Sequence, residues 1–106
     1  MKKTRRGRAS WNIHPGEVLR EEFLKPFQMS SYELAKRIRV PAPRVNDIVL
    51  EKRGITADTA VRLAKFFGNT ETFWMNLQAF YEVRGAKSRL GKELGRIQPR
   101  ATKTAA

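Results

Sequence analysis

Side chains that can hydrogen-bond to base edges are concentrated in the six residues from 42 to 47. An arginine can pair with two atoms of guanine, an asparagine with two atoms of adenine, and an aspartate can accept from N4 of cytosine. Small apolar side chains can contact the methyl group of thymine. We therefore predict a surface that reads bases in the major groove of DNA. The residues predicted to contact bases are Ala42, Pro43, Arg44, Asn46 and Asp47.

Other roles remain open for the polar members of this group. Arg44 could meet a phosphate as well as a guanine, since a guanidinium binds both. Asp47 could hold Arg44 in place rather than accept from cytosine. The alternative to base reading is that Arg44, Asn46 and Asp47 form only an ordinary solvated helix face.

A helix-turn-helix at about residues 31–50 would present this surface to a groove. Ser30, followed by Glu33 three residues later, forms a capping box that starts the first of the two helices. The second helix is predicted over residues 42–50. Its inward-facing apolar residues recur at helical spacing: Val45, Ile48 and Val49.

The turn between the two helices departs from the usual pattern at one position. Arg39 stands where a glycine is common in this motif. A positive φ there would cost an arginine on the order of 1 kcal/mol. We therefore expect a turn with a different backbone.

Three more helices complete an all-α, five-helix prediction. The first begins at Pro15 and is stopped by Pro26. The fourth follows a cap at Thr56 and ends at Gly68, and the fifth follows a cap at Thr70. No segment alternates apolar and polar residues in the way that a half-buried strand does.

The fifth helix carries an aromatic face that we divide between a core and a self-interface. Phe73, Trp74 and Leu77 are assigned mostly to the core, and Phe80 and Tyr81 to a dimer interface. A dimer that presents two base-reading helices on one face would match two half-sites about 34–36 Å apart on DNA.

The net charge of +12 lies mainly at the two ends of the chain. Residues 1–10 contribute +5, residues 84–106 contribute +6, and residues 11–83 contribute only +1. We predict one helix-turn-helix domain over residues 13–83, flanked by flexible basic arms at 1–12 and 84–106. The arms either lie on phosphates or remain solvated, and the basic surplus favours a polyanionic partner.

Hydroxyl and basic groups at the ends of the motif's helices are predicted to contact phosphates. Such contacts set the register on DNA without reading its sequence. The residues in this group are Ser31, Lys36, Lys52 and Arg53. For Arg53, hydrogen bonds to helix-end carbonyls are the alternative.

Catalytic and metal-binding residues are scarce, and we expect no enzyme, no cofactor and no metal. The chain has no cysteine, and its one histidine, His14, precedes a helix-starting proline, where capping or packing is the usual role. No apolar run suits a secretory signal or a membrane span, which predicts a cytoplasmic protein.

The chain resembles the HigA family of antitoxins, within the Cro/C1-type helix-turn-helix class, over residues 13–83. Four runs carry the resemblance: IHPGEVLREEFLKPF, YELAKRIRVPAPRVNDIV, KRGITADTAVRLAKFFG and FWMNLQAFYEV. The resemblance implies a bacterial homodimer that binds a palindromic operator in its own promoter and represses it, which would associate it with the nucleoid. It also implies a partner, a HigB-like toxin of the RelE class that cleaves messenger RNA. The alternative is a stand-alone repressor without a toxin.

Overall fold

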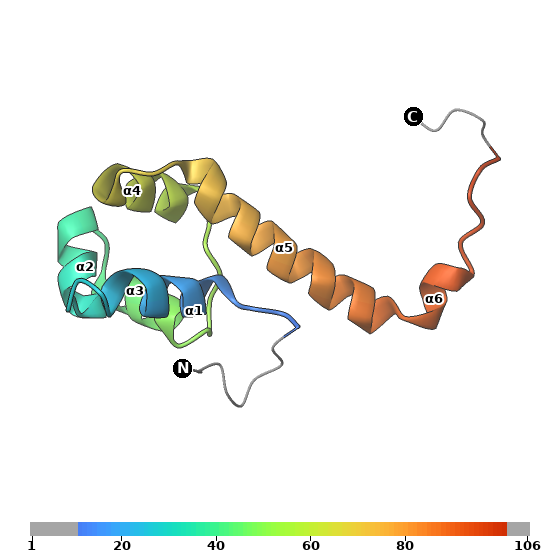
Figure 1. Ribbon diagram of the computed structural model, residues 1–106, viewed down its shortest axis with the longest axis horizontal. Coiled ribbons are helices and arrows are strands. Elements are labelled where there is room, and N and C mark those ends of the chain that lie inside the picture. Colours follow the sequence, from blue (N-terminus) through green and yellow to red (C-terminus); the bar gives the residue numbers. More distant parts are fainter. Residues whose placement is uncertain (1–10, 102–106) are drawn as a thin grey trace.

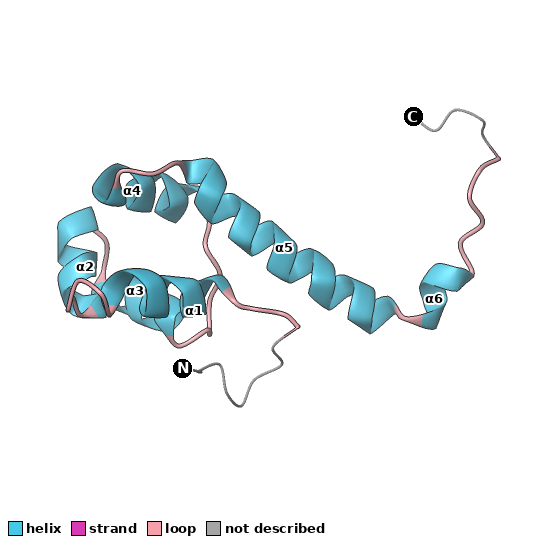
Figure 2. Ribbon diagram, viewed as in Figure 1, coloured by secondary structure: helices cyan, strands magenta, loops and turns pink. Residues whose placement is uncertain are grey.

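The computed structural model describes residues 11–101, which contain helices and loops but no strand (Figure 2). The all-α prediction is confirmed. Residues 1–10 of the predicted N-terminal arm and 102–106 of the predicted C-terminal arm lie outside the described residues. The elements in chain order are α1 (Pro15–Val18), η1 (Leu19–Leu24), α2 (Ser31–Ile38), α3 (Ala42–Val49), α4 (Ala57–Phe67), α5 (Glu71–Leu90) and α6 (Lys92–Gly95).

Side-chain caps start the helices at the residues that the sequence predicts. Ser30, Thr56 and Thr70 each accept a hydrogen bond from the backbone N–H three residues further on. His14 caps α1, because its Nδ1 accepts from the backbone N–H of Gly16 at 2.8 Å. These bonds satisfy backbone donors that a helix start otherwise leaves unpaired.

The first predicted helix is present, but it is not a regular α-helix throughout. Its second part, η1, is π-helical, and the helix ends at Leu24, before Pro26. The chain then turns through Gln28, which has a φ of 54°.

A single core joins η1, α2, α3, α4 and the first half of α5, and α1 packs against α3 and α5 (Figure 1). Trp74 of α5 is fully buried in it and donates from Nε1 to Oδ1 of Asn69 at 2.9 Å. The other fully buried large apolar residues come from η1, α2, α3 and α4: Leu19, Leu34, Val45, Ile48 and Leu63.

The turn between α2 and α3 has the backbone of a glycine turn, so the expectation of a different backbone is wrong. Arg39 is left-handed, with φ 63° and ψ 49°. Its N–H donates to the Lys36 carbonyl, and the N–H of Val40 donates to the Ala35 carbonyl. These bonds close the end of α2 as they do when glycine occupies the position, and the strain of about 1 kcal/mol is tolerated.

The fifth helix is longer than predicted. It continues seven residues past Val83 to Leu90, and α6 follows after Gly91, so the first part of the predicted C-terminal arm is helical. The apolar period fades because the helix leaves the core, whereas residues 84–90 include several good helix formers. In Figure 1 this end of α5 projects from the bundle, and the described part of the chain measures 52 × 29 × 24 Å.

Gly16 of α1 lies directly against the backbone of α3, and this contact generates a prediction. A Cβ at this position would lie 1.8 Å from the carbonyl oxygen of Ile48, which is backbone and cannot rotate away. Gly16→Ala should lower the free energy of unfolding by about 3 kcal/mol or more, measured by urea denaturation.

The control is Gly95→Ala in α6, where a Cβ meets nothing within 4 Å. This variant should change the free energy of unfolding by no more than about 0.5 kcal/mol. Equal stability of the two variants would show that the contact between α1 and α3 is not tight.

Candidate nucleic-acid interface

The five residues predicted to contact bases, here called the reading edge, lie on one side of α3, opposite a face that is wholly buried. Val45, Ile48 and Val49 are in the core, as predicted. Pro43 and Asn46 are exposed. The remaining three residues predicted to contact bases, Ala42, Arg44 and Asp47, are half-buried. An edge of this composition offers donors, acceptors and apolar contacts to a groove.

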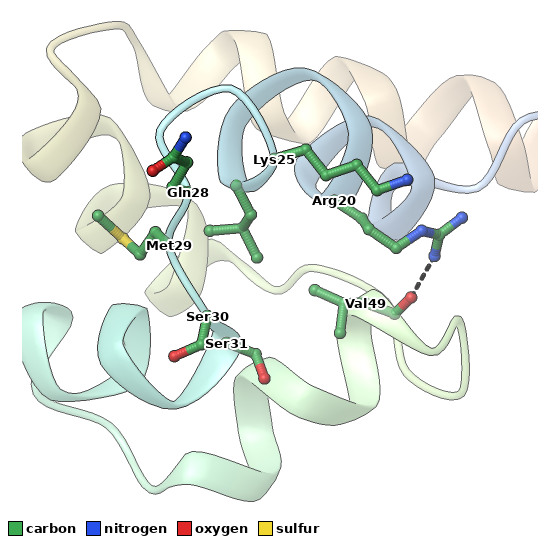
Figure 3. Close-up of a pocket in the computed structure, with 8 residues that line it drawn as sticks. Arg20, Lys25, Gln28, Met29, Ser30, Ser31 and Val49 are labelled. Atoms are coloured by element: carbon green, nitrogen blue, oxygen red, sulfur yellow. Dashed lines mark hydrogen bonds between the residues drawn. The ribbon is translucent and has the colours of Figure 1, made fainter.

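Interactions at its C-terminal end hold α3 in place. Arg20 of η1 donates from Nη1 to the carbonyl oxygen of Val49, as the dashed line in Figure 3 shows, and its Nη2 lies 3.3 Å from Oε2 of Glu51. A guanidinium suits the carbonyl end of a helix, where the backbone leaves acceptors unpaired. The hollow between η1, α2 and α3 in Figure 3 is lined by Arg20, Lys25, Ser30, Ser31 and Val49 among others.

One residue predicted to bind phosphate lies beside one predicted to bind a base. Ser31, at the first turn of α2, donates from Oγ to Oδ1 of Asn46 at 3.3 Å. This bond orients the Asn46 amide in the free protein, and its NH₂ group can still serve as a donor. The start of α2 and the reading edge of α3 therefore form one continuous surface.

The carboxylate that holds Arg44 is that of Asp58, not that of Asp47. Nη1 of Arg44 donates to Oδ1 of Asp58 at 2.9 Å, and Nε of Arg62 donates to the same oxygen at 2.7 Å. Hydrogen bonds from Arg62, and then from Arg44, stabilise the carboxylate and lower the pKa of Asp58 below its ordinary value. The sequence pattern did not predict this contact, because the two residues lie 14 positions apart.

Asp47 faces the loop between α3 and α4 instead. Its Oδ2 lies 3.8 Å from Nη2 of Arg53, and both Lys52 and Arg53 are exposed in that loop. Lys36 lies apart from this group, on the exposed face of α2, with its Nζ 5.6 Å from the ring centroid of Tyr32. The loop and the start of α2 thus flank the reading edge with basic and hydroxyl groups.

A buried amide from α5 fixes the same loop. Oε1 of Gln78 accepts from the backbone N–H of Ile55 at 2.7 Å, and its Nε2 donates to Oε2 of Glu82 at 2.7 Å. A Cβ on Gly54 would lie 2.6 Å from the Gln78 amide, so the glycine lets the two segments meet. Sequence reasoning assigned Gln78 no role, although it belongs to one of the four runs that carry the family resemblance.

The predicted self-interface begins where α5 leaves the core. Phe80 is 64% exposed, whereas Tyr81 is half-buried, with its ring centroid 4.7 Å from that of His14. Phe73 is partly exposed, Leu77 half-buried and Trp74 fully buried. A shallow apolar hollow on this face is lined by Trp11, Ile13, Val18, Leu77, Phe80 and Arg84.

Within residues 11–101 no group of three or more His, Cys, Asp or Glu side chains could hold a metal ion. His14 is buried as the cap of α1. In the same part of the chain, no helix combines the length and the apolar character that crossing a membrane requires.

Known proteins share both the sequence and the fold. A profile of the Helix-turn-helix family matches residues 21–74. Virulence-associated protein I of Dichelobacter nodosus is 52% identical over 75 residues, 71% of this chain and 69% of that protein. Antitoxin HigA-1 of Vibrio cholerae is 32% identical over 99 residues, 93% of this chain and 90% of that protein. Other curated relatives are described only as HTH-type transcriptional regulators.

A solved structure of the antitoxin HigA of Pseudomonas aeruginosa with the higBA promoter superposes with a TM-score of 0.81. The two chains are 49% identical, and the match covers 84% of this chain and 98% of that one.

The clamp between Gln78 and the α3–α4 loop generates a prediction for stability. Gln78→Ala should lower the free energy of unfolding by about 1–3 kcal/mol, because it leaves the buried N–H of Ile55 without its acceptor. Urea denaturation measures the loss. The matched control is Gln98→Ala, at an exposed position, which should change the stability by less than about 0.5 kcal/mol. An equal loss of stability in the two variants would show that the hydrogen bond between Gln78 and Ile55 does not hold the loop.

Proposed function

Because the chain belongs to the HigA antitoxin family of helix-turn-helix proteins, we propose that it binds a palindromic operator in its own promoter as a homodimer and represses transcription. We propose that it also binds and neutralises a HigB-like toxin that cleaves messenger RNA. Its role is then recognition, and the toxin chemistry belongs to the partner.

The reading edge of α3 is the observation that carries the DNA-binding proposal. An eight-residue helix buries its apolar side completely and leaves its N-terminal polar side accessible, as a recognition helix must. We propose base contacts from Ala42, Pro43, Arg44, Asn46 and Asp47. We propose phosphate contacts from Ser31, Lys36, Lys52 and Arg53.

The exposed apolar face of α5 supports the homodimer. Trp11 and Val83 are about half exposed and Phe80 still more so, which leaves an apolar surface open to solvent. Trp11 and Phe80 also line the hollow on this face. A second copy would bury this surface and would place a second reading edge on the same DNA. The predicted interface residues are Phe80 and Tyr81.

The relatives named as antitoxins support the toxin partner, whereas those named only as transcriptional regulators support the stand-alone repressor. A pull-down of the tagged chain, co-expressed with the product of the adjacent gene, separates these two functions. Retention of a small RelE-like protein through a salt wash supports the antitoxin. Absence of a co-purifying partner and of such a gene supports the stand-alone repressor.

Titration against DNA tests the operator proposal. The probes are the chain's own promoter and a scrambled duplex of equal length, each at about 50 and 200 mM salt. Specific binding should lose less affinity with added salt than the phosphate-driven background does. Equal affinity for both duplexes, falling together with salt, would refute sequence-specific binding.

Two substitutions should separate base reading from phosphate binding. Asn46→Ala should weaken operator binding by about 1–3 kcal/mol and relax the preference at one base pair, because an adenine loses its amide partner. Arg53→Ala should instead weaken binding to all DNA and reduce the salt slope by about one. Both are measured by fluorescence anisotropy. Unchanged operator affinity in Asn46→Ala would show that α3 has a different orientation on DNA.

Phe80→Asp should dissociate the dimer. Burying one phenylalanine is worth about 1.5–3 kcal/mol, and a twofold interface buries it twice, so the dimer dissociation constant should rise about 100-fold or more. Analytical ultracentrifugation measures it. Phe27→Asp is the control, because Phe27 is 62% exposed on the loop after η1. A dimer that survives the Phe80 substitution must use another face.

A further inference from the structure

Asp58, in the first turn of α4, joins α4 to both helices of the helix-turn-helix. Its Oδ1 accepts from Arg44 on α3 and from Arg62 one turn further along α4. Nη1 of Arg62 donates in turn to the carbonyl oxygen of Ile38 at 2.8 Å, at the end of α2. A single carboxylate oxygen therefore links the reading edge to the turn that precedes it.

This network is poorly suited to stabilising the fold. The side chains of Asp58 and Arg44 are 57% and 31% exposed, and ion pairs in contact with water contribute little to folding. Thr56 already caps α4, so the helix does not need Asp58 to begin. The clearest effect of the network is to restrict the position of the Arg44 side chain.

We propose that Asp58 is a positioning residue for base reading, which holds the Arg44 guanidinium at the reading edge so that Arg44 donates to a guanine rather than to a phosphate. The inference rests on the proposed DNA-binding function. The contact with Asp58 uses one of five N–H donors, and the others can serve N7 and O6 of guanine. An arginine that is ordered before binding also loses less rotamer freedom in the complex.

The charge of Asp58 gives the proposal a signature that a purely structural residue would lack. A carboxylate beside DNA repels the phosphates of any sequence, so it lowers non-specific affinity. Holding Arg44 acts in the opposite sense and only where the sequence offers the guanine. Removal of the charge should therefore maintain or raise non-specific affinity while it lowers discrimination.

The first step of the test identifies the guanine. The wild-type chain selects its preferred site from a library of random DNA duplexes, and each guanine of that site is then replaced by 7-deazaguanine, which lacks the N7 acceptor. One replacement should weaken wild-type binding about tenfold or more. Arg44→Ala should bind the site more weakly and should no longer respond to that replacement.

The second step tests Asp58 itself. In Asp58→Asn the penalty for 7-deazaguanine at the same position should fall to about twofold or less. Binding to a scrambled duplex should be equal to wild type or tighter, and a cooperative thermal melt shows that the variant is folded. In the Arg44→Ala background, Asp58→Asn should leave the penalty unchanged. Asp58→Ser should behave as Asp58→Asn does, and it serves in its place if the Asn variant melts below the assay temperature.

A matched control removes the same charge elsewhere. Glu33 pairs with Arg37 at 3.4 Å on the surface of α2, and Glu33→Gln should retain the wild-type penalty. The inference is overturned if Asp58→Asn retains the full 7-deazaguanine penalty or if Glu33→Gln loses the penalty equally. It is also overturned if Arg44→Ala leaves the penalty unchanged at every guanine. A wild-type chain that selects no sequence from the library refutes the proposed function instead, so the two failures are distinguishable.

Discussion

The packing of one face of α3 against the core is the constraint on which the rest of the structure depends. An eight-residue helix is far too short to persist in water by itself. Its helicity therefore comes from the burial of Val45, Ile48 and Val49 against the neighbouring helices. Because that burial fixes the rotation of α3 about its axis, it also determines which side chains remain accessible. Structure and proposed recognition are thus two consequences of the same apolar stripe.

Acidic side chains are paired with arginines around this apolar stripe. Among residues 11–83, acids nearly balance bases, and two of the acids face arginines next to the reading edge: Asp58 with Arg44, and Asp47 with Arg53. A surface of unopposed arginines would bind any polyanion through its phosphates. Carboxylates among the arginines reduce that general attraction and orient the donors that remain. Under the proposed DNA-binding function, this arrangement favours discrimination between sequences over maximal affinity.

Local signals were readable from the sequence, whereas contacts between distant residues were not. Caps at Ser30, Thr56 and Thr70, and the left-handed Gly68, follow from residue type and the onset of an apolar period, and the structure confirms them. The backbone at Arg39 was missed because packing of α2 against α3 outweighs about 1 kcal/mol of strain.

The pairing of Arg44 with Asp58, 14 residues apart, depends on how α4 packs, which no local pattern encodes. The same holds for Gln78 and Ile55, 23 residues apart. The length of α5 was missed because an apolar period reports burial rather than helicity. The contacts to DNA remain predictions.

The projecting end of α5 would couple its own folding to association with a partner. Beyond Val83 the helix has left the core, and a short helix with little burial is marginal in water. A partner that binds this end contributes its binding free energy to helix formation, so local order becomes a function of partner concentration. Under the proposed homodimer, the order of this end therefore rises with protein concentration. Local order at the end of α5 is then determined by association as well as by the sequence of the helix.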